Sequence, residues 1–251
     1  IMVLSIALIG AIFYDRKSSV ATNVESSKRQ LPIYCVDTTD KKVALSFDAA
    51  WGNEDTEEIL AILKKHDVHV TFFMTGGWVK NYPEDVKTIY DGHEVAVHTL
   101  THPNLTQCDD AEVIRQVESD RLNLSELVGY EVVGMAYPCG GVNNDDRVAD
   151  IIKKNTGVKY SRTITTNDSF DLQENLFRFN PTVYHLDFEE MMQLGESFIE
   201  LKPETPKIFY VWGHSYEMDY GADYWVKLEE FFKLISNKDD IFYGTNKEVL
   251  L

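Results

Sequence analysis

One strand–helix–strand unit decides the fold, and its sequence is VALSFDAAWGNEDTEEILAILKKHDVHVTFFM at residues 43–74. The two ends, 43–47 and 68–74, are short apolar runs rich in β-forming residues, which predict strands. Between them, apolar residues recur at helical spacing from Ile59 to Leu63, and Asn53 suits the cap position of that helix. A strand, a crossover helix and a second strand predict a right-handed unit with parallel strands.

The same alternation continues along the chain. Strand candidates lie at 94–97, 132–136, 159–162, 181–185, 208–212 and 241–243, and helical patterns lie near 83–90, 109–128, 145–154, 188–201 and 222–235. About seven such units predict an α/β fold whose mostly parallel sheet closes into a barrel. Active sites of such folds lie at the carboxyl ends of the strands. Asp48, His98 and His214 all follow predicted strands closely, as does the turn Tyr137–Gly140.

The N-terminal residues have the pattern of a targeting segment. Residues 1–13, IMVLSIALIGAIF, carry no charge and precede a polar stretch, although they are fewer than the ~20 apolar residues of a spanning helix. We expect a signal anchor or transmembrane segment at 1–14, a polar linker at 15–30 and one globular domain at 31–251. This organisation predicts an extracytoplasmic protein, membrane-anchored or secreted, that contacts the membrane only through the N-terminal segment. The alternative is a buried N-terminal strand or helix of the domain.

Composition and charge exclude several classes of partner. Of the 251 residues, 44% are hydrophobic and 26% are charged, which is the composition of a globular domain. The net charge of −17 argues against nucleic acid, whose phosphates require a basic surface, and against anionic lipid. The widely spaced Cys35, Cys108 and Cys139 match no zinc motif and allow at most one disulfide, so free thiols are expected.

Two histidines, His98 and His102, form the most informative short motif. On a helical turn, imidazoles at i and i+4 lie on one face, about 5–6 Å apart at Cβ, and suit a shared metal ion. Thr99 occupies the position of the glutamate in the HExxH motif of metalloproteases, which excludes that motif. The alternative is a pair of surface histidines bonded to other partners.

Asp48 and His214 are the other candidates for chemistry. Asp48 ends the first predicted strand, so its carboxylate is a helix cap, a catalytic base or a metal ligand. Asn53 is better placed for the cap, which favours the functional roles of Asp48. His214 follows Trp212 and Gly213, and its imidazole suits either a general acid or a core histidine with both nitrogens bonded.

Five segments occur in the order found in one enzyme family. They are Ser46-Phe47-Asp48, Thr71-Phe72-Phe73, Gly92 to His102, Tyr137-Pro138-Cys139-Gly140 and Trp212-Gly213-His214. On these segments the chain resembles the polysaccharide deacetylase (NodB-like) family, carbohydrate esterase family 4, from about Val43 to Thr245. Residues 47–53 look most like its sporulation-type branch. The resemblance implies a distorted (β/α) barrel that removes acetyl groups hydrolytically from N-acetylated sugars of a cell-wall or chitin-like glycan.

The resemblance also implies roles for the ionisable residues. Asp48 corresponds to the catalytic base, which removes a proton from the attacking water, and His214 to the acid that protonates the leaving amine. His98 and His102 correspond to metal-binding histidines. The implied cofactor is a divalent metal, zinc or another first-row transition metal, which polarises the amide carbonyl and the water.

Three further residues match substrate-binding positions of the family. Cys139 takes the place whose backbone N–H faces the oxyanion. Tyr137 and Trp212 stand in the same two motifs and are predicted to contact the substrate. The implied partner is therefore a glycan, and we expect the protein to act as a monomer.

The chain departs from the family pattern at several positions. Ala49 stands where the family usually has a second aspartate that binds the metal. Ala136 stands where an arginine usually braces the base, and Arg162 is a candidate to replace that arginine in space. Trp212 replaces a leucine, and no clear counterpart of a tryptophan–aspartate pair lies between 157 and 181.

The change at position 49 leaves two neutral imidazoles as metal ligands. Asp48 or Glu217 is predicted to complete the site, and Asp48 would be a poorer base if it bound the metal. A metal-independent hydrolase of a small amide or ureide, and a non-catalytic glycan-binding wall protein, are therefore the alternatives. After the last motif, a wall that stacks on sugars is predicted from four aromatic residues: Tyr216, Tyr220, Tyr224 and Trp225.

Overall fold

Residues 41–251 are described by the computed structural model of this chain. The expected anchor segment, the linker, the domain start at residue 31 and Cys35 lie outside the described residues and stay predictions. Within 41–251, no helix combines the length and the apolar composition that crossing a bilayer requires.

Residues 41–251 contain a sheet of eight strands, and the strands pair in parallel. The strands are β1 (Lys41–Ala49), β2 (Thr71–Met74), β3 (Glu94–Val97), β4 (Gly134–Ala136), β5 (Tyr160–Arg162), β6 (Val183–Tyr184), β7 (Lys207–Gly213) and β8 (Ile241–Tyr243). Seven of these follow the order β5-β4-β3-β2-β1-β7-β6, and β8 pairs with β1. This curled half-barrel confirms the predicted α/β fold of about seven parallel strands.

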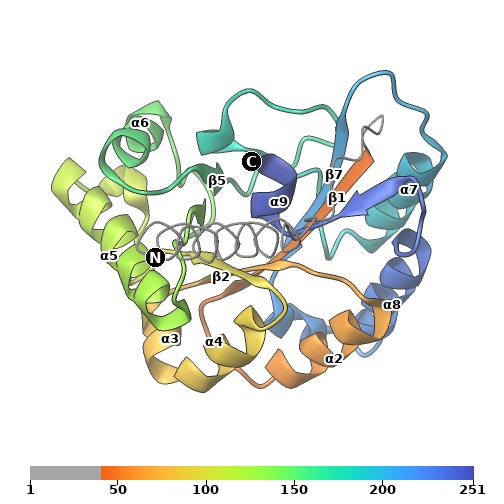
Figure 1. The fold of residues 1–251 in the computed structure, drawn as a ribbon, viewed down its shortest axis with the longest axis horizontal. Coiled ribbons are helices and arrows are strands. Elements are labelled where there is room, and N and C mark those ends of the chain that lie inside the picture. Colours follow the sequence, from red (N-terminus) through yellow and green to blue (C-terminus); the bar gives the residue numbers. More distant parts are fainter. Residues whose placement is uncertain (1–40) are drawn as a thin grey trace, which may run out of the picture. The chain divides into compact units, whose positions relative to one another are not determined.

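Helices cover the outside of the curled sheet (Figure 1). The α-helices are α2 (Thr56–His66), α3 (Gly76–Asn81), α4 (Pro83–Tyr90), α5 (Asp110–Val128), α6 (Asp146–Asn155), α7 (Phe188–Glu200), α8 (Tyr224–Ile235) and α9 (Asn246–Leu250). Three 3-10 helices are η2 (Leu105–Gln107), η3 (Leu176–Arg178) and η4 (Ser215–Tyr220) in this part of the chain. Figure 1 shows the α-helices following one another around the strands, from α6 and α5 through α3, α4 and α2 to α8 and α7.

The start of α2 differs from the sequence prediction. The helix begins at Thr56, and Asp55 occupies the N-cap position without a side-chain cap hydrogen bond. Asn53, the predicted cap, instead donates from Nδ2 to Asp85 Oδ2 in the first turn of α4 (2.7 Å). Asn53 therefore ties the loop after β1 to a neighbouring helix.

Alternation along β1 divides its side chains between two environments. Val43, Leu45 and Phe47 belong to the large apolar core between sheet and helices, where a fully buried side chain of this kind contributes roughly 1.5–3 kcal/mol. Ala44 packs instead in a separate cluster inside the barrel. Asp48 shares the face of Ala44, because successive strand residues point to opposite sides. The barrel interior is therefore where β1 presents its carboxylate.

The amino-terminal end of the barrel is closed by α9 and a buried polar network. The Glu94 carboxylate accepts hydrogen bonds from Thr71 Oγ1 (2.8 Å), Tyr160 OH (3.0 Å) and the Lys247 backbone N–H (2.9 Å). The backbone N–H of Asn246 donates to the same Thr71 hydroxyl (2.8 Å). Thr71 and Glu94 begin β2 and β3, so the network seals the end opposite the carboxyl ends of the strands.

The two edges of the sheet are joined by the segment that leads into β6. Phe179 N–H donates to Ser161 O (2.9 Å) and Thr163 N–H donates to Phe179 O (2.9 Å), which ties this segment to β5. Thr182 N–H donates to Tyr210 O of β7 (2.8 Å). One short segment thus bridges both edges, which explains the distorted shape of the barrel.

A pair of carboxylates lies between the loop after β1 and η4. Asp55 is hydrogen-bonded to Asp219, and Glu54 and Glu58 add negative charge nearby. Partial burial, together with the charge of Asp219, raises the pKa of Asp55 to about 6. Asp55 therefore keeps its proton in the folded protein at pH values where the unfolded chain has released it.

The raised pKa of Asp55 should make stability depend on pH. Its contribution is fully present below about pH 4 and is lost as the pH rises through 6. We expect Asp55→Asn to raise the melting temperature relative to the wild type at pH 8 and not at pH 4, as measured by calorimetry. The control is Glu57→Gln, which removes a carboxylate from the same helical turn. An equal pH-dependent gain in both variants would contradict the assignment to Asp55.

Candidate functional site

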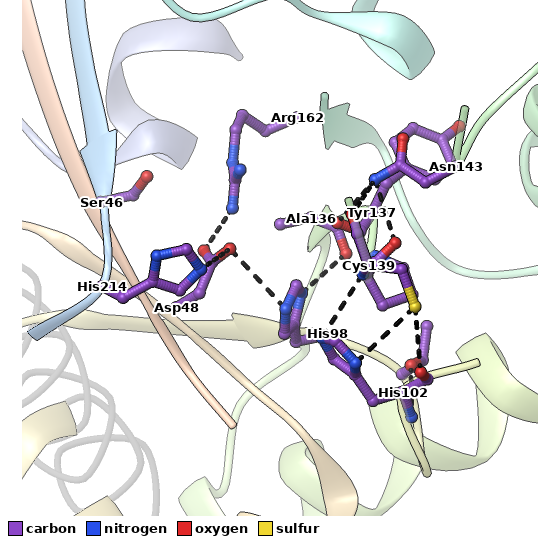
Figure 2. Close-up of polar contacts among 12 residues, drawn as sticks. Ser46, Asp48, His98, His102, Ala136, Tyr137, Cys139, Asn143, Arg162 and His214 are labelled. Atoms are coloured by element: carbon purple, nitrogen blue, oxygen red, sulfur yellow. Dashed lines mark hydrogen bonds and ion pairs between the residues drawn. The ribbon is translucent and has the colours of Figure 1, made fainter. Parts of the chain in front are cut away.

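A cavity of about 210 Å³ lies at the carboxyl ends of the strands. All seven predicted site residues line it: Asp48, His98, His102, Tyr137, Cys139, Trp212 and His214. Trp51 and Tyr216 also line this cavity. Figure 2 shows Asp48 between His98 and His214, with Arg162 approaching from a third direction.

The buried carboxylate of Asp48 forms an ion pair with Arg162. Arg162 Nη2 donates to Asp48 Oδ1, and both side chains are almost fully buried. The guanidinium also stacks on Trp212, with Arg162 Cζ 4.4 Å from the ring centre. Burial is the largest single effect and opposes ionisation of Asp48, but the charge and hydrogen bond of Arg162, together with His98 and His214, outweigh it and lower the pKa of Asp48 below its ordinary value. Asp48 is therefore anionic at neutral pH.

Sheet register explains how Arg162 replaces the missing arginine. Ala136 and Arg162 are register partners in the pairing of β4 with β5. Ala136 and Tyr160 pack in one interior cluster, and Arg162 shares the face of Tyr160 because it lies two residues further along the strand. The small Ala136 side chain leaves room on this face for the guanidinium of its neighbour. The structure thus places Arg162 where the sequence suggested it.

His98 presents a neutral imidazole to the cavity. Its Nδ1–H donates to the Ala136 carbonyl (3.1 Å), so Nε2 carries the lone pair. Burial lowers the pKa of His98 to about 4, which keeps the ring neutral at physiological pH. Nε2 lies 3.7 Å from Asp48 Oδ2. Asp120 Oδ2 on α5 accepts the His98 backbone N–H (3.3 Å), which positions the residue at the end of β3.

His102 reaches His98 through a turn and not through the predicted helix. Thr99 and His102 lie outside the helices and have left-handed backbones, with φ of 71° and 62°. The Thr99 hydroxyl accepts the His102 N–H (3.1 Å) and stabilises the turn. The ring centres of His98 and His102 are 4.9 Å apart. The helical prediction was wrong, although the two imidazoles do lie together; strained backbone of this kind concentrates at functional sites.

The turn after β4 places a backbone N–H beside His102. Cys139 has a left-handed φ of 67°, and Asn143 Nδ2 donates to its carbonyl (2.7 Å). Cys139 N–H approaches His102 Nε2 at 3.5 Å, a long contact that leaves this donor available to a bound group. Burial raises the pKa of the Cys139 thiol, so the thiol stays neutral. The Tyr137 hydroxyl is engaged by the Phe177 carbonyl (2.7 Å) and so is occupied within the protein.

His214 is held by a carboxylate on η4. Glu217 Oε2 accepts hydrogen bonds from His214 Nδ1–H (2.8 Å) and His185 Nε2–H (2.7 Å), and the Tyr184 hydroxyl donates to Oε1. Burial opposes ionisation of Glu217, but these donors outweigh it and lower the pKa of Glu217. His214 Nε2 is thereby turned toward the cavity, 3.8 Å from Asp48 Oδ2.

Glu217 does not take the metal-ligand role predicted for it beside His98 and His102. Among the described residues, it forms with His185 and His214 a group whose donor atoms lie within 4.8 Å of one another. Its donor atoms are 2.7 and 2.8 Å apart, which are hydrogen-bond lengths. Ligands around one ion, each at about 2.0–2.2 Å, stand further from one another. The group is therefore a hydrogen-bonded support for His214.

Some residues of the site were not predicted from the sequence. His185 ends the predicted strand 181–185, and the same signal that singled out His98 was present there. Trp51 follows Asp48 by three positions, so proximity in sequence could have revealed it. Asn143 carries no signal, because its partners are backbone carbonyls of the preceding turn.

The donor atoms beside Asp48 fit a divalent metal. The unprotonated Nε2 of His98 and Asp48 Oδ2 face each other across 3.7 Å, and two acceptors at this separation suit a cation between them. The ring centres of His98 and His102 are 4.9 Å apart, but among the described residues the donor atoms of Asp48, His98 and His102 do not all lie within 4.8 Å of one another. Ala49 contributes no oxygen and packs in the main core. The site therefore has one carboxylate, Asp48, at the positions where the resemblance implied two.

Matches to known proteins extend over much of the chain. A family model described as polysaccharide deacetylase matches residues 36–160. The uncharacterized protein YlxY of Bacillus subtilis (strain 168) is 34% identical over 110 residues, which are 43% of this chain and 34% of YlxY. Peptidoglycan-N-acetylmuramic acid deacetylase PdaC of the same organism is 34% identical over 113 residues, 45% of this chain and 24% of PdaC. The chain thus spans less than half the length of these relatives.

A solved structure extends the likeness beyond the family model. A mutant of BA3943 from Bacillus anthracis, described as a CE4 family pseudoenzyme with restored enzymatic activity, matches with a TM-score of 0.60. The sequences are 26% identical, and the match covers 84% of this chain and 68% of that one. Coverage of this extent reaches past residue 160 into the half of the chain that supplies Arg162 and His214.

Loss of Arg162 should leave Asp48 as an unpaired buried charge. We expect Arg162→Met to lower the free energy of unfolding by about 3–5 kcal/mol, the usual cost of removing one partner of a buried pair. Adding Asp48→Asn should restore part of this loss, because the unpaired charge is removed. Urea unfolding of the single and double variants measures both effects.

The control for this series is Lys154→Met, which breaks an exposed ion pair with Asp150. It should leave the unfolding midpoint unchanged. If Arg162→Met and the double variant lost the same free energy of unfolding, the loss would not come from the unpaired charge of Asp48.

Proposed function

Because this chain belongs to the polysaccharide deacetylase family, we propose that it removes acetyl groups hydrolytically from N-acetylated sugars of a cell-wall or chitin-like glycan. A relative named as a peptidoglycan-N-acetylmuramic acid deacetylase supports this substrate class. The observation that carries the proposal is that the anion Asp48 faces His214 Nε2 across 3.8 Å in one cavity. Amide hydrolysis requires a base and an acid in such an arrangement.

Asp48 acts as the base in this proposal. Arg162 occupies Oδ1, so Oδ2 is the oxygen directed toward the imidazoles of the cavity. Oδ2 takes a proton from the water that attacks the amide carbon. The ion pair keeps the carboxylate charged despite its burial, so the base is ready at neutral pH.

His214 acts as the acid. It transfers the proton on Nε2 to the leaving nitrogen, because an amine leaves a tetrahedral intermediate poorly unless it is protonated. Glu217 engages Nδ1–H (2.8 Å), so Nε2 is the nitrogen free to exchange a proton with the substrate. The backbone N–H of Cys139 is the donor that would stabilise the oxyanion.

A divalent metal, zinc or another first-row transition metal, is part of the proposal, since deacetylases of this family are generally metal-dependent. His98 and His102 would hold it together with Asp48, which would then be a poorer base, because Arg162 already occupies the other oxygen of its carboxylate. A bound metal would polarise the amide carbonyl and the attacking water. His98 is prepared for this role, because its Nδ1–H is already fixed on a backbone carbonyl. Ala49 has no side-chain oxygen, so we expect the site to bind the metal weakly.

We also propose that the protein works outside the cytoplasm as a monomer, anchored or exported through residues 1–14. A cell-wall or chitin-like substrate is reached only from outside the cytoplasm. The net charge of −17 suits a soluble domain in that environment.

A second candidate is a glycan-binding protein that has lost catalysis. Ala49 in place of a metal ligand and the likeness to the BA3943 pseudoenzyme favour this function. The retention of Asp48, His98, His102 and His214 in one cavity favours the enzyme. A metal-independent hydrolase of a small amide or ureide is the remaining alternative.

Acetate release from N-acetylglucosamine oligomers should be detectable with the purified chain, and chelation of metal should suppress it. Asp48→Asn and His214→Ala should each lower kcat about 100-fold or more, because positioned acids and bases contribute ~10²–10⁴-fold. A coupled acetate assay measures the rates, and circular dichroism checks folding. The control is His69→Ala, an exposed histidine near the start of β2.

Each result of this assay separates the candidate functions. A wild-type rate in either variant would refute the role assigned to that residue. Release that survives exhaustive chelation would remove the metal from the proposed mechanism and leave the deacetylase function in place. Oligomer binding without acetate release favours the non-catalytic protein.

Restoring a carboxylate at position 49 should strengthen metal binding. Ala49→Asp adds a carboxylate at the last residue of β1, and this carboxylate must turn out of the main core to bind the metal. We expect the zinc affinity then to rise by about tenfold or more. Competition with a chromophoric chelator measures the dissociation constant without reference to activity. Ala50→Asp, which adds the same charge one residue further on, is the control. Equal gains in both variants would show a general charge effect and no ligand position at 49.

A further inference from the structure

The aromatic residues predicted to contact the substrate lie in different surroundings. Tyr216 lines the cavity and contacts Tyr220, with 5.9 Å between their ring centres. Tyr224 and Trp225 pack against the main core, so they do not belong to the predicted sugar-stacking wall. Trp212 lines the cavity as well, yet it is only 8% exposed. Most contacts of Trp212 are therefore made within the protein.

Trp212 stacks on the buried guanidinium of Arg162. Arg162 Cζ lies over two aromatic rings, 4.4 Å from the ring centre of Trp212 and 5.3 Å from that of Phe73. Arg162 and Phe73 are fully buried. A cation within ~6 Å of an aromatic face is attracted to it, most strongly for tryptophan and for groups removed from water. Two aromatic faces therefore hold the guanidinium.

Hydrogen bonds alone leave the guanidinium incompletely fixed. Of its N–H groups, Nη2 donates to Asp48, and Nη1 makes only a long contact with the Thr163 carbonyl (3.4 Å). Nε of Arg162 has no hydrogen-bond partner within residues 41–251. One strong hydrogen bond allows a planar group to rotate about it, so the flat face of Trp212 determines the plane of the guanidinium.

Sheet register explains why these rings meet Arg162. Asp48 pairs with Phe73 across β1 and β2, and Ser46 pairs with Trp212 across β1 and β7. Ser46 and Asp48 point to the same side of β1, because they are two residues apart. Arg162 reaches Asp48 from β5, so its guanidinium lies over the rings of both neighbouring strands.

The same tryptophan also contacts the residues that hold the acid. The ring centre of Trp212 is 4.9 Å from that of Tyr184, its register partner on β6, and 5.6 Å from that of His214. The Tyr184 hydroxyl donates to Glu217, the carboxylate that holds His214. Trp212 therefore lies between the support of the base and the support of the acid.

Two departures from the family pattern are connected by this contact. The arginine that usually stands at position 136 is replaced by Arg162, and the leucine of the last motif is replaced by Trp212. A leucine offers no aromatic face to a guanidinium. We propose that Trp212 is the positioning residue of Arg162, which braces Asp48, and that substrate binding is not its role. The effect on catalysis rests on the proposed function, whereas the contact itself does not.

A double-variant cycle tests the contact without any substrate. Trp212→Leu and Arg162→Met are made singly and together, and urea unfolding gives the folding equilibrium constant of each. Trp212→Leu should lower this constant about tenfold less in the Arg162→Met background than in the wild type, because the stacking partner is already absent. The control cycle combines Trp212→Leu with Lys154→Met, whose exposed ion pair is independent of the site, and should be additive. Trp212→Met replaces the leucine variant in both cycles if that variant does not fold.

Kinetics distinguish positioning from substrate binding. A lost substrate contact raises KM, whereas a misplaced brace lowers kcat and leaves KM unchanged. We expect Trp212→Leu to lower kcat about tenfold on N-acetylglucosamine oligomers, with KM within about twofold of the wild type. Trp212→Phe has a side chain of similar size to leucine but keeps an aromatic face, so it should retain most of kcat.

The outcomes separate this proposal from the proposed function. Coupling of Trp212 to Arg162 in the cycle supports the positioning role even where the wild type releases no acetate, and the proposed hydrolysis then fails alone. Additive losses in the cycle overturn the positioning role whatever the activity. A raised KM with a wild-type kcat in Trp212→Leu also overturns it and leaves the hydrolysis intact, as does an equal loss of kcat in Trp212→Phe and Trp212→Leu.

Discussion

The buried ion pair between Asp48 and Arg162 is the interaction on which the rest of the site depends. A carboxylate removed from water ordinarily binds a proton, because an unpaired buried charge is costly. Arg162 prevents this and determines which oxygen of Asp48 faces His98 and His214. The pair also crosses the barrel interior, since β1 and β5 are separated by three strands in the sheet order. This one ion pair therefore keeps the site negatively charged and also joins two strands that are not neighbours in the sheet.

The fold could be predicted from the sequence because strand and helix periodicity are local properties. The apolar runs at 43–47 and 208–212 lie within β1 and β7, and the pattern at 109–128 matches α5 almost to the residue. The capping of α2 could not be predicted in the same way. Asn53 bonds to Asp85, which lies 32 positions further along the chain, and no local pattern records that neighbour.

The site was predictable to the extent that the carboxyl ends of parallel strands converge, which brings Asp48, His98 and His214 together. The hydrogen-bond partners of these residues and the conformation of their backbone could not be predicted as well from the sequence. The spacing of His98 and His102 is the same in a helix and in a tight turn, so sequence could not distinguish them. Glu217 was one of the two residues predicted to complete the metal site, yet it is hydrogen-bonded to His185, which directly follows β6.

Closure of the amino-terminal end by α9 has a consequence for how the chain folds. The contact between Asn246 and Thr71 joins residues 175 positions apart, and that between Lys247 and Glu94 joins residues 153 positions apart. Contacts between such distant residues form late and slow folding. Until α9 docks, Thr71 and Glu94 lack the backbone N–H donors of Asn246 and Lys247, and Glu94 keeps the hydrogen bonds from Thr71 and Tyr160. A partly folded barrel is therefore open at the end opposite the candidate site until α9 docks and closes it.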